Sequence, residues 1–212
     1  MTCPTTACFD GLRVGEKMVQ VGGQLRYFGD GYQTSKVLEG RRLWRIPVME
    51  GEFLVDETVN IQQAVGGGNF LILGETGAVT LAAAEAASEA IGAVEGTITP
   101  FPGGVVRSGS KTWSKYKFLR ASTNSAYCPT LRGQVEGALP EGANSVLEIV
   151  IDGLTEEAVA KAMRIGIEAA CRPGIVRISA GNYGGTLGQY QLHLHELMSD
   201  EYRHHPGKTG YA

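Results

Sequence analysis

The chain has 212 residues, a formal net charge of −3 at pH 7, and 43% hydrophobic and 19% charged residues. This length is enough for one large domain or two small ones with a buried core, and the composition is ordinary for a soluble globular protein. A dedicated nucleic-acid binder would be strongly basic over a whole face, and no apolar run approaches the roughly 20 residues of a membrane helix, so neither class is expected.

The N-terminus and the cysteines favour a cytoplasmic protein. The first residues carry neither the cationic segment nor the apolar core of a signal peptide. The cysteines are not spaced as metal ligands, and in a chain of this size they are expected to be reduced thiols. They are Cys3, Cys8, Cys128 and Cys171.

The first 50 residues read as part of a lobe. Their β-branched and aromatic residues predict strands at 25–28 and 42–48, separated by a turn at 29–31, and a further strand follows at 53–55. No helix pattern accompanies these strands, although a sheet needs a second layer to cover it. Residues 1–50 are therefore predicted to be the remnant of a larger lobe.

Residues 51–198 repeat one plan twice and predict one complete lobe. Each repeat reads strand, glycine turn, helix, strand, and Thr155 is positioned to cap the second helix. Two β-α-β units sharing one sheet predict an α+β fold of the ferredoxin-like βαββαβ type, an antiparallel sheet with helices on one face. Strands are expected at 69–73, 97–99, 146–152, 175–179 and 190–195, the first helix at 79–93, and a polar tail at 199–212.

A long insertion, residues 101–142, separates the repeats and has a cationic centre. No Asp or Glu occurs between Glu95 and Glu136, and glycines and hydroxyls alternate with the cations, which suits the binding of phosphate or carboxylate groups. Its aromatic residues argue against disorder and predict a strand at 116–119, although a solvated basic loop remains the alternative. The cations are Arg107, Lys111, Lys115, Lys117, Arg120 and Arg132.

Glu148 is the most informative single residue. It lies in the middle of a predicted core strand, between Val146 and Val150 on the same face, where a carboxylate is unfavourable unless it is paired or hydrogen-bonded. Burial would favour its protonated form and suit a general acid or base in acyl transfer. The alternative is a partly wet face on which Glu148 pairs with a lysine.

Other motifs are weaker. Residues 108–111 and 114–117 have the Ser-x-x-Lys spacing of serine acyl-enzymes, but their composition opposes the helix that this motif opens. Residues 104–112 resemble a phosphate-binding loop with one residue too many, so nucleoside triphosphate binding is excluded. The glycine-rich stretch 181–188 departs from the dinucleotide fingerprint and is predicted to be a strand-end loop that a ligand or another chain can approach.

The histidines do not predict a metal site. His193 and His195 would share one face of the predicted last strand and could chelate a metal. Without a third ligand at suitable spacing, a paired or structural role is favoured.

Several collinear stretches, extending together from about residue 1 to residue 198, resemble one family. Taken together they are similar to the formylmethanofuran–tetrahydromethanopterin formyltransferases, enzymes of one-carbon metabolism in methanogens and some methylotrophic bacteria. The stretches are residues 27–33, 47–53, 67–70, 101–104, 110–115, 121–124, 148–154, 179–185 and 187–190.

The resemblance implies two ferredoxin-like lobes, a homotetramer built from dimers, and coenzyme clefts near the subunit interface. It implies methanofuran and tetrahydromethanopterin as coenzyme substrates, with no metal or prosthetic group at the transfer site. Bacterial members are subunits of a formyltransferase/hydrolase complex, and the modest net charge favours a bacterial setting. Family members also carry a longer N-terminal part, so this chain is expected to begin inside the first lobe.

The resemblance also implies site residues. Glu148 matches the position of a catalytic carboxylate, and we expect it to be protonated at rest and to hydrogen-bond the formyl carbonyl or relay its proton. Both coenzymes are polyanions, which the insertion cations would neutralise. The expected binding residues are Arg107, Ser108, Ser110, Lys111, Ser114, Lys115, Ser122, Asn124, Asn182 and Tyr183.

Three functional hypotheses remain open at this point. The first is an active formyltransferase, and the second is a non-catalytic scaffold subunit or inactive fragment. The third is a ferredoxin-like small-molecule sensor, which the basic insertion and Glu148 disfavour.

Overall fold

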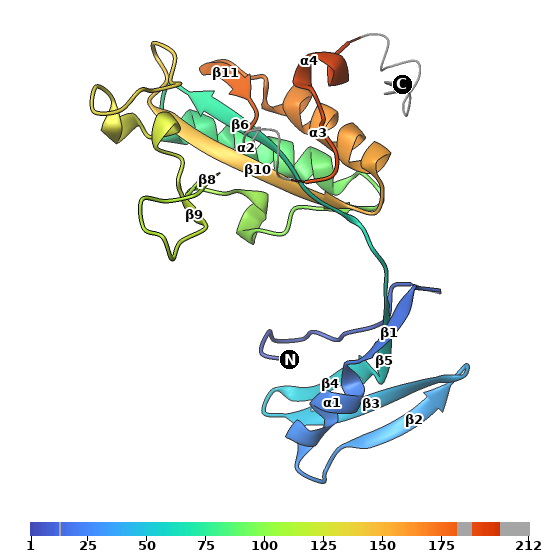
Figure 1. Ribbon diagram of the computed structural model, residues 1–212. Helices are drawn as coiled ribbons and strands as arrows, with labels where there is room; N and C mark the ends of the chain where they lie inside the picture. Colours follow the sequence, from blue (N-terminus) through green and yellow to red (C-terminus); the bar gives the residue numbers. More distant parts are fainter. Residues whose placement is uncertain (13, 182–187, 200–212) are drawn as a thin grey trace. The chain divides into compact units, whose positions relative to one another are not determined.

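The computed structural model describes residues 1–12, 14–181 and 188–199. It has a mixed α+β fold in which the strands of every sheet are antiparallel, and four α-helices lie within the described residues (Figure 1). The chain divides into two compact units, Met1–Gln63 and Ala64–Ala212. In the part of the chain that the structure describes, no helix has both the length and the apolarity needed to cross a membrane.

The first unit contains a three-stranded sheet of order β2-β3-β4 and a separate pair, β1 and β5. Its small core consists of Ile46, Phe53 and Val55. The elements are β1 Lys17–Gln20, α1 Gly22–Leu25, the 3₁₀ turn η1 Arg26–Gly29, β2 Thr34–Leu38, β3 Arg41–Val48, β4 Gly51–Asp56 and β5 Thr58–Ile61.

The strand predicted at 25–28 is wrong, because these residues belong to α1 and η1. The carbonyl of Val21 accepts hydrogen bonds from Gln24 N–H at 3.1 Å and Leu25 N–H at 2.9 Å, so the chain curls into a helical turn directly after β1. Asp30, with φ of 50°, then ends the turn in the left-handed region. The apolar residues there resembled a strand only by composition.

The second unit contains a four-stranded sheet of order β11-β6-β10-β7. Its elements follow one another as β-α-β-β-α-β, as the two sequence repeats predict. Thr155 caps the second helix as expected, accepting a hydrogen bond from Ala158 N–H at 3.2 Å. The elements are β6 Val65–Gly74, α2 Gly77–Gly92, β7 Thr97–Ile98, β10 Ser145–Gly153, α3 Glu156–Ala170 and β11 Ile175–Ser179.

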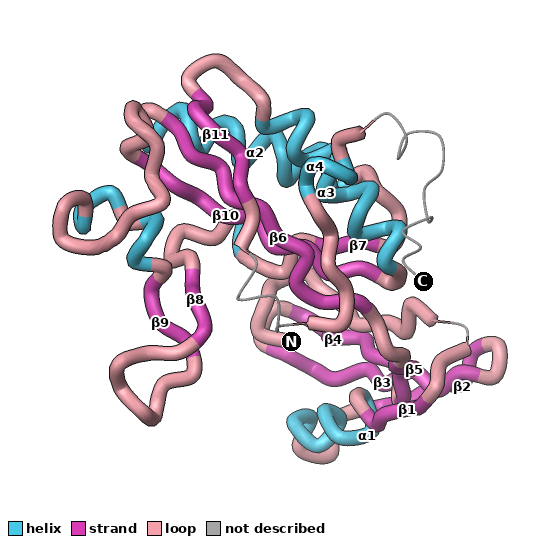
Figure 2. The backbone as a smooth tube through the Cα atoms, turned by 45° about the horizontal axis from the view of Figure 1, so that its top comes forward, coloured by secondary structure: helices cyan, strands magenta, loops and turns pink. Residues whose placement is uncertain are grey.

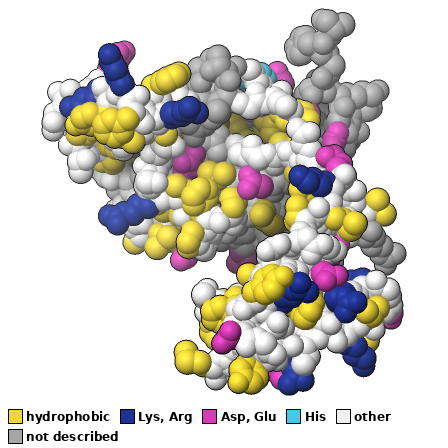
Figure 3. Space-filling model, turned by 60° about the horizontal axis from the view of Figure 1, so that its bottom comes forward, with side chains coloured by type: hydrophobic (Ala, Val, Ile, Leu, Met, Phe, Trp, Pro, Cys, Tyr) yellow, Lys and Arg dark blue, Asp and Glu magenta, His cyan; other side chains and the backbone are white. Residues whose placement is uncertain are grey.

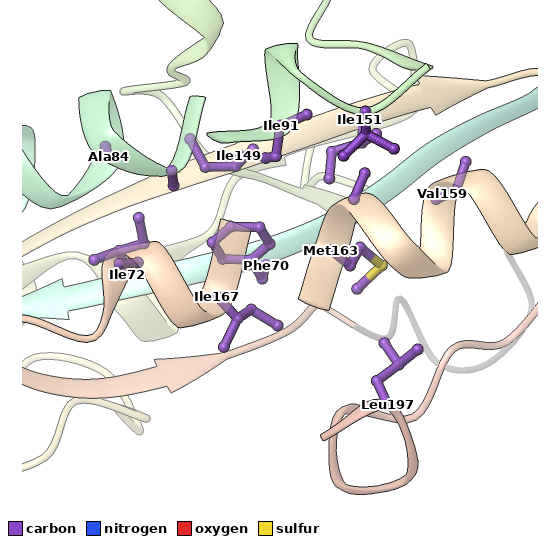
Figure 4. Close-up of a cluster of buried hydrophobic side chains, with 14 of the residues drawn as sticks. Phe70, Ile72, Ala84, Ile91, Ile149, Ile151, Val159, Met163, Ile167 and Leu197 are labelled. Atoms are coloured by element: carbon purple, nitrogen blue, oxygen red, sulfur yellow. The ribbon is translucent and has the colours of Figure 1, made fainter. Parts of the chain in front are cut away.

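Side chains alternate between the two faces of this sheet. Phe70 and Ile72 of β6, with Ile149 and Ile151 of β10, pack against α2 and α3, which lie along one face (Figures 2 and 4). The intervening residues point to the other face, which the insertion covers. Buried Leu71, Leu73 and Ala143 pack there against Tyr127, Leu139 and Val146.

The insertion forms a small hairpin whose tip extends from residue 113 to residue 120. The strand predicted at 116–119 is wrong, because Trp113 N–H donates to Arg120 O at 2.7 Å and closes a turn there. Its aromatic side chains are exposed and have no partner strand within the described residues. The elements of the insertion are η2 Pro102–Gly104, β8 Ser110–Thr112, β9 Ala121–Thr123, η3 Ser125–Tyr127 and η4 Pro129–Leu131.

The last predicted strand, at 190–195, is also wrong. His193 is the N-cap of a short helix, α4 Leu194–Leu197, and Leu197 N–H donates to His193 O at 2.9 Å. Leu197 is buried in the core of the second unit. His193 and His195 are therefore exposed residues around a helix start and do not share a strand face.

Candidate active site

Strand β10 positions Glu148 in the middle of the sheet, on the face that the insertion covers. Glu148 is only 4% exposed and lies opposite Leu71 of β6. On its other side, Glu148 N–H donates to Val106 O at 2.9 Å, and Val106 N–H donates to Glu148 O at 2.8 Å. The insertion therefore pairs with β10 at the residue that bears the carboxylate.

The carboxylate of Glu148 is hydrogen-bonded inside the protein. Asn69 Nδ2 donates to Glu148 Oε1 at 2.7 Å, and Asn69 is 8% exposed. The other oxygen faces the insertion, since a Cβ added at Gly109 would lie 4.0 Å from Glu148 Oε2. Gly109 has φ of 48°, a conformation that glycine adopts easily. The site thus brings together the carboxyl group of Glu148, the side-chain amide of Asn69 and the backbone of Gly109.

Hydrogen bonds shape the hairpin that follows Gly109. Asn124 N–H donates to Gly109 O at 3.2 Å, and Lys111 Nζ donates to Ser125 Oγ at 2.9 Å. Ser122 Oγ donates to Trp113 O at 2.6 Å. Three residues predicted to bind coenzyme, Lys111, Ser122 and Asn124, therefore also hold the hairpin in shape.

The structure separates the remaining predicted binding residues into two groups. Arg107 and Ser108 are exposed and directly follow the Val106–Glu148 bridge, and Ser110 is exposed at the start of β8. Ser114 and Lys115 belong instead to the tip of the hairpin. Ser114 Oγ accepts a hydrogen bond from Tyr116 N–H at 3.1 Å, and Lys115 Nζ lies 5.3 Å from the centre of the Tyr116 ring.

Two predicted binding residues, Asn182 and Tyr183, lie outside the described residues. The structure therefore assigns them no place.

The charge of the insertion is not neutralised by carboxylates in the described parts of the chain. The ion pairs there are Arg41–Asp56, Arg42–Glu57, Arg45–Glu52 and Arg164–Glu168, and none includes an insertion cation. Figure 3 shows Lys and Arg side chains lying among hydrophobic side chains on one face of the molecule. Exposed cations beside exposed aromatic rings suit a ligand that carries several negative charges and an apolar part.

Sequence reasoning gave no role to Asn69 or Gly109. The detectable signal for Asn69 was a polar residue at the start of the apolar run of β6, and it became informative only with the register that brings it beside Glu148. Gly109 was one of 30 glycines and carried no separate signal.

Within residues 1–12, 14–181 and 188–199, no group of three or more His, Cys, Asp or Glu side chains could hold a metal ion.

Two family profiles match the chain. The sequence profile described as "FTR, proximal lobe" matches residues 51–197. The profile described as formylmethanofuran–tetrahydromethanopterin formyltransferase matches residues 1–48.

Individual relatives match along almost the whole chain. The formylmethanofuran–tetrahydromethanopterin formyltransferase of Methylococcus capsulatus is 59% identical over 203 residues, covering 94% of this chain and 68% of the relative. The enzyme of the same name from Methanopyrus kandleri is 56% identical over 202 residues, covering 93% of this chain and 67% of the relative. The chain therefore spans about two thirds of the length of these relatives.

Solved structures have the same fold. The formyltransferase of Methanosarcina barkeri matches with a TM-score of 0.79 and 49% identity, covering 92% of this chain and 67% of that chain. A chain of the formyltransferase/hydrolase complex of Methylorubrum extorquens, solved with methylofuran, matches with a TM-score of 0.75 and 51% identity, covering 88% of this chain and 64% of that chain.

Proposed function

The chain belongs to the formylmethanofuran–tetrahydromethanopterin formyltransferase family, and from this premise we propose that it transfers a formyl group between formylmethanofuran and tetrahydromethanopterin at Glu148. The reaction is an acyl transfer of one-carbon metabolism. The observation that supports the position of the site is the buried Glu148 carboxyl group, which lies where the cationic insertion pairs with β10.

The chemistry requires a group that can donate and accept a proton beside the formyl carbonyl. The attacking amine forms a bond to the formyl carbon, and the carbonyl oxygen gains negative charge in the tetrahedral intermediate. Collapse breaks the bond to the leaving amine, which takes up the proton that the attacking amine loses. Protonated Glu148 hydrogen-bonds the carbonyl oxygen or relays this proton, and its burial limits competition from water.

The insertion binds the polyanionic coenzymes. Arg107 and Ser108 directly follow Val106, which pairs with Glu148, and they contact the coenzyme groups near the formyl carbon. Lys111 and Lys115 bind more distant carboxylate or phosphate groups, with Ser110, Ser114, Ser122 and Asn124 as hydrogen-bonding partners. Asn182 and Tyr183 complete the binding set, as the family resemblance implies.

The two parts of the chain correspond to lobes. Residues 51–198 form a ferredoxin-like lobe, supported by the strand order β11-β6-β10-β7 with helices on one face, and 101–142 is its insertion. Residues 1–50 belong to a second lobe of similar type. The chain acts as a homo-oligomer, a dimer or tetramer, with the two coenzymes as its substrates and no metal or prosthetic group.

A second candidate is a non-catalytic subunit of a larger assembly. It is favoured by one relative, which is part of a formyltransferase/hydrolase complex. In this case the chain binds the other subunits, while Glu148 is dispensable.

One substitution tests the catalytic proposal. Glu148→Gln keeps the shape of the side chain but removes its proton exchange, so transfer in the purified chain should fall by about a hundredfold or more. Glu141→Gln, which changes an exposed carboxylate of the insertion, is the matched control and should leave transfer unchanged. Undiminished transfer by Glu148→Gln would remove Glu148 from the mechanism, and an inactive chain that binds hydrolase subunits would favour the second candidate.

A further inference from the structure

The proposed reaction leaves one buried polar side chain of the site without a role. Asn69 and Glu148 are both nearly inaccessible, and Asn69 Nδ2 lies 2.7 Å from Glu148 Oε1. The register places Asn69 opposite Val150 and Glu148 opposite Leu71, so the two polar residues are diagonal neighbours on one face of the sheet. Because both residues lie in regular strands, the pairing of β6 with β10 determines the position of the amide beside the carboxyl group.

We infer that Asn69 is a positioning residue for formyl transfer, because its hydrogen bond to Glu148 Oε1 holds the carboxyl group with Oε2, the oxygen that exchanges the proton, towards the insertion. This inference rests on the proposed function of Glu148. It concerns which oxygen reacts, which that proposal left undecided.

Asn69 and Glu148 have complementary donors and acceptors. An amide NH₂ group can only donate, so the carboxyl oxygen that meets it must accept. In a protonated carboxyl group the carbonyl oxygen is the better acceptor, and the hydroxyl is the donor. The hydrogen bond from Asn69 therefore favours Oε1 as the carbonyl oxygen of Glu148 and Oε2 as the oxygen that exchanges the proton.

The second carboxyl oxygen of Glu148, Oε2, points towards the insertion. The Cβ position of Gly109 lies 4.0 Å from Oε2, so this oxygen faces the backbone of the insertion. A glycine there adds no side chain between the carboxyl group and the segment proposed to bind coenzyme. The proton is thus held on the side of Glu148 where the formyl group is proposed to arrive.

The proton moves in balance with the bonds. The attacking amine forms a bond to the formyl carbon, the carbonyl electron pair moves onto the formyl oxygen, and the Oε2 hydroxyl donates a hydrogen bond to that oxyanion. Because the Oε2 proton is shared with the oxyanion, Glu148 becomes more negative and its bond from Asn69 becomes stronger. When the intermediate collapses, the electron pair re-forms the carbonyl and the C–N bond to the leaving amine breaks. Oε2 gives its proton to that amine and takes up the proton lost by the attacking amine.

An interaction that strengthens during the reaction affects turnover more than binding. Asn69→Ala in the full 212-residue chain should therefore lower kcat by about tenfold or more, as expected for one hydrogen bond to a charged group. The KM for each coenzyme should change by less than about twofold. Asn144→Ala is the matched control, because the exposed Asn144 amide donates only to the carbonyls of Glu75 and Gly142 among the described residues.

A second variant separates positioning from packing. Asn69→Asp has nearly the same shape as the native residue, but its ionised carboxylate cannot donate to Glu148 Oε1. Its kcat should therefore fall at least as far as that of Asn69→Ala, while the KM for each coenzyme changes by less than about twofold.

The outcomes separate the two proposals. The inference is supported if kcat falls in both variants of Asn69 while KM stays unchanged. It is overturned if kcat and KM change together, as a purely structural role for Asn69 would give, or if both variants keep the kcat of the wild-type chain. If Glu148→Gln keeps full activity, the catalytic proposal fails. If Glu148→Gln is inactive and both variants of Asn69 keep full kcat, only the inference about Asn69 fails.

Discussion

The chain contains two nearly inaccessible carboxylates in the described residues, one in each unit, and their partners differ in charge. Asp56 in the first unit is 2% exposed and accepts hydrogen bonds from Asp10 N–H at 2.7 Å and Arg41 Nε at 3.2 Å. Glu148 in the second unit accepts a hydrogen bond from the neutral amide of Asn69. A cationic partner matches a permanent negative charge, whereas a neutral donor serves a carboxyl group in both protonation states. Burial alone therefore does not identify a reactive carboxylate.

The surroundings of Asp56 indicate a structural role. The hydrogen bond to Asp56 raises the pKa of Arg41 above its ordinary value. Asp10 belongs to the same group, because its carboxylate accepts hydrogen bonds from Leu12 N–H at 3.1 Å and Asn60 Nδ2 at 2.6 Å. These bonds tie the N-terminal segment and Arg41 to the end of β4. They hold the first unit together where its hydrophobic core is small.

Asp56 and Glu148 should differ most in their contributions to the free energy of unfolding. Asp56→Ala removes the acceptor of the Arg41 and Asp10 hydrogen bonds, so we expect the free energy of unfolding to fall by about 2 kcal/mol, a value that allows for the half-exposed Arg41 side chain. Urea unfolding followed by circular dichroism measures the change. Glu57→Ala, which breaks the more exposed Arg42 ion pair, should lose less than about 1 kcal/mol. Equal losses in the two variants would contradict a structural role for Asp56.

The same region should respond to acid. Burial by itself would raise the pKa of Asp10, but hydrogen bonds from Leu12 N–H and Asn60 outweigh it, and the pKa lies below its ordinary value. A carboxyl group with a lowered folded-state pKa binds more protons when unfolded, so its stabilisation is complete above the unfolded-state pKa and is lost as pH falls below about 4 through the folded-state pKa. Asp10→Asn should flatten the dependence of stability on pH in that acidic range. An unchanged slope in acid urea titrations would exclude Asp10 as a contributor.

The smallest effect on stability is expected at Glu148. Glu148→Gln keeps an oxygen that accepts from Asn69, so the free energy of unfolding should change by less than about 1 kcal/mol although transfer is lost. Urea unfolding of the same preparation used for the transfer assay provides the measurement. A loss as large as that of Asp56→Ala would make the two carboxylates alike and would explain the loss of activity by unfolding.

Regular elements with strong periodicity were predictable from the sequence. The repeat of strand, glycine turn, helix and strand located the sheet and both long helices, and the N-cap at Thr155 followed from local chemistry. Short elements were not. Strands β1 and β5 have four residues each and few buried side chains, so they left little pattern to detect. The strand predicted at 190–195 was wrong because the single turn of α4, Leu194–Leu197, is too short to show its helical period.

The candidate site was predictable only in part. Glu148 stands out because a carboxylate interrupts an apolar strand, and local sequence contains that signal. Its contact with Asn69 depends on the register of β6 and β10, and its approach to Gly109 depends on the path of the insertion. Neither follows from local propensity, since both are set by pairings between distant residues.

The distance along the chain between Asn69 and Glu148 also bears on folding. These residues are 79 positions apart, and they meet only when β6 and β10 pair. Contacts of such long range carry a large loop-closure entropy and tend to form late, after local helices and turns. During synthesis the pair can form only after β10 has left the ribosome. Protection of the β10 amides from hydrogen exchange would therefore report the moment at which the folding chain acquires its reactive centre.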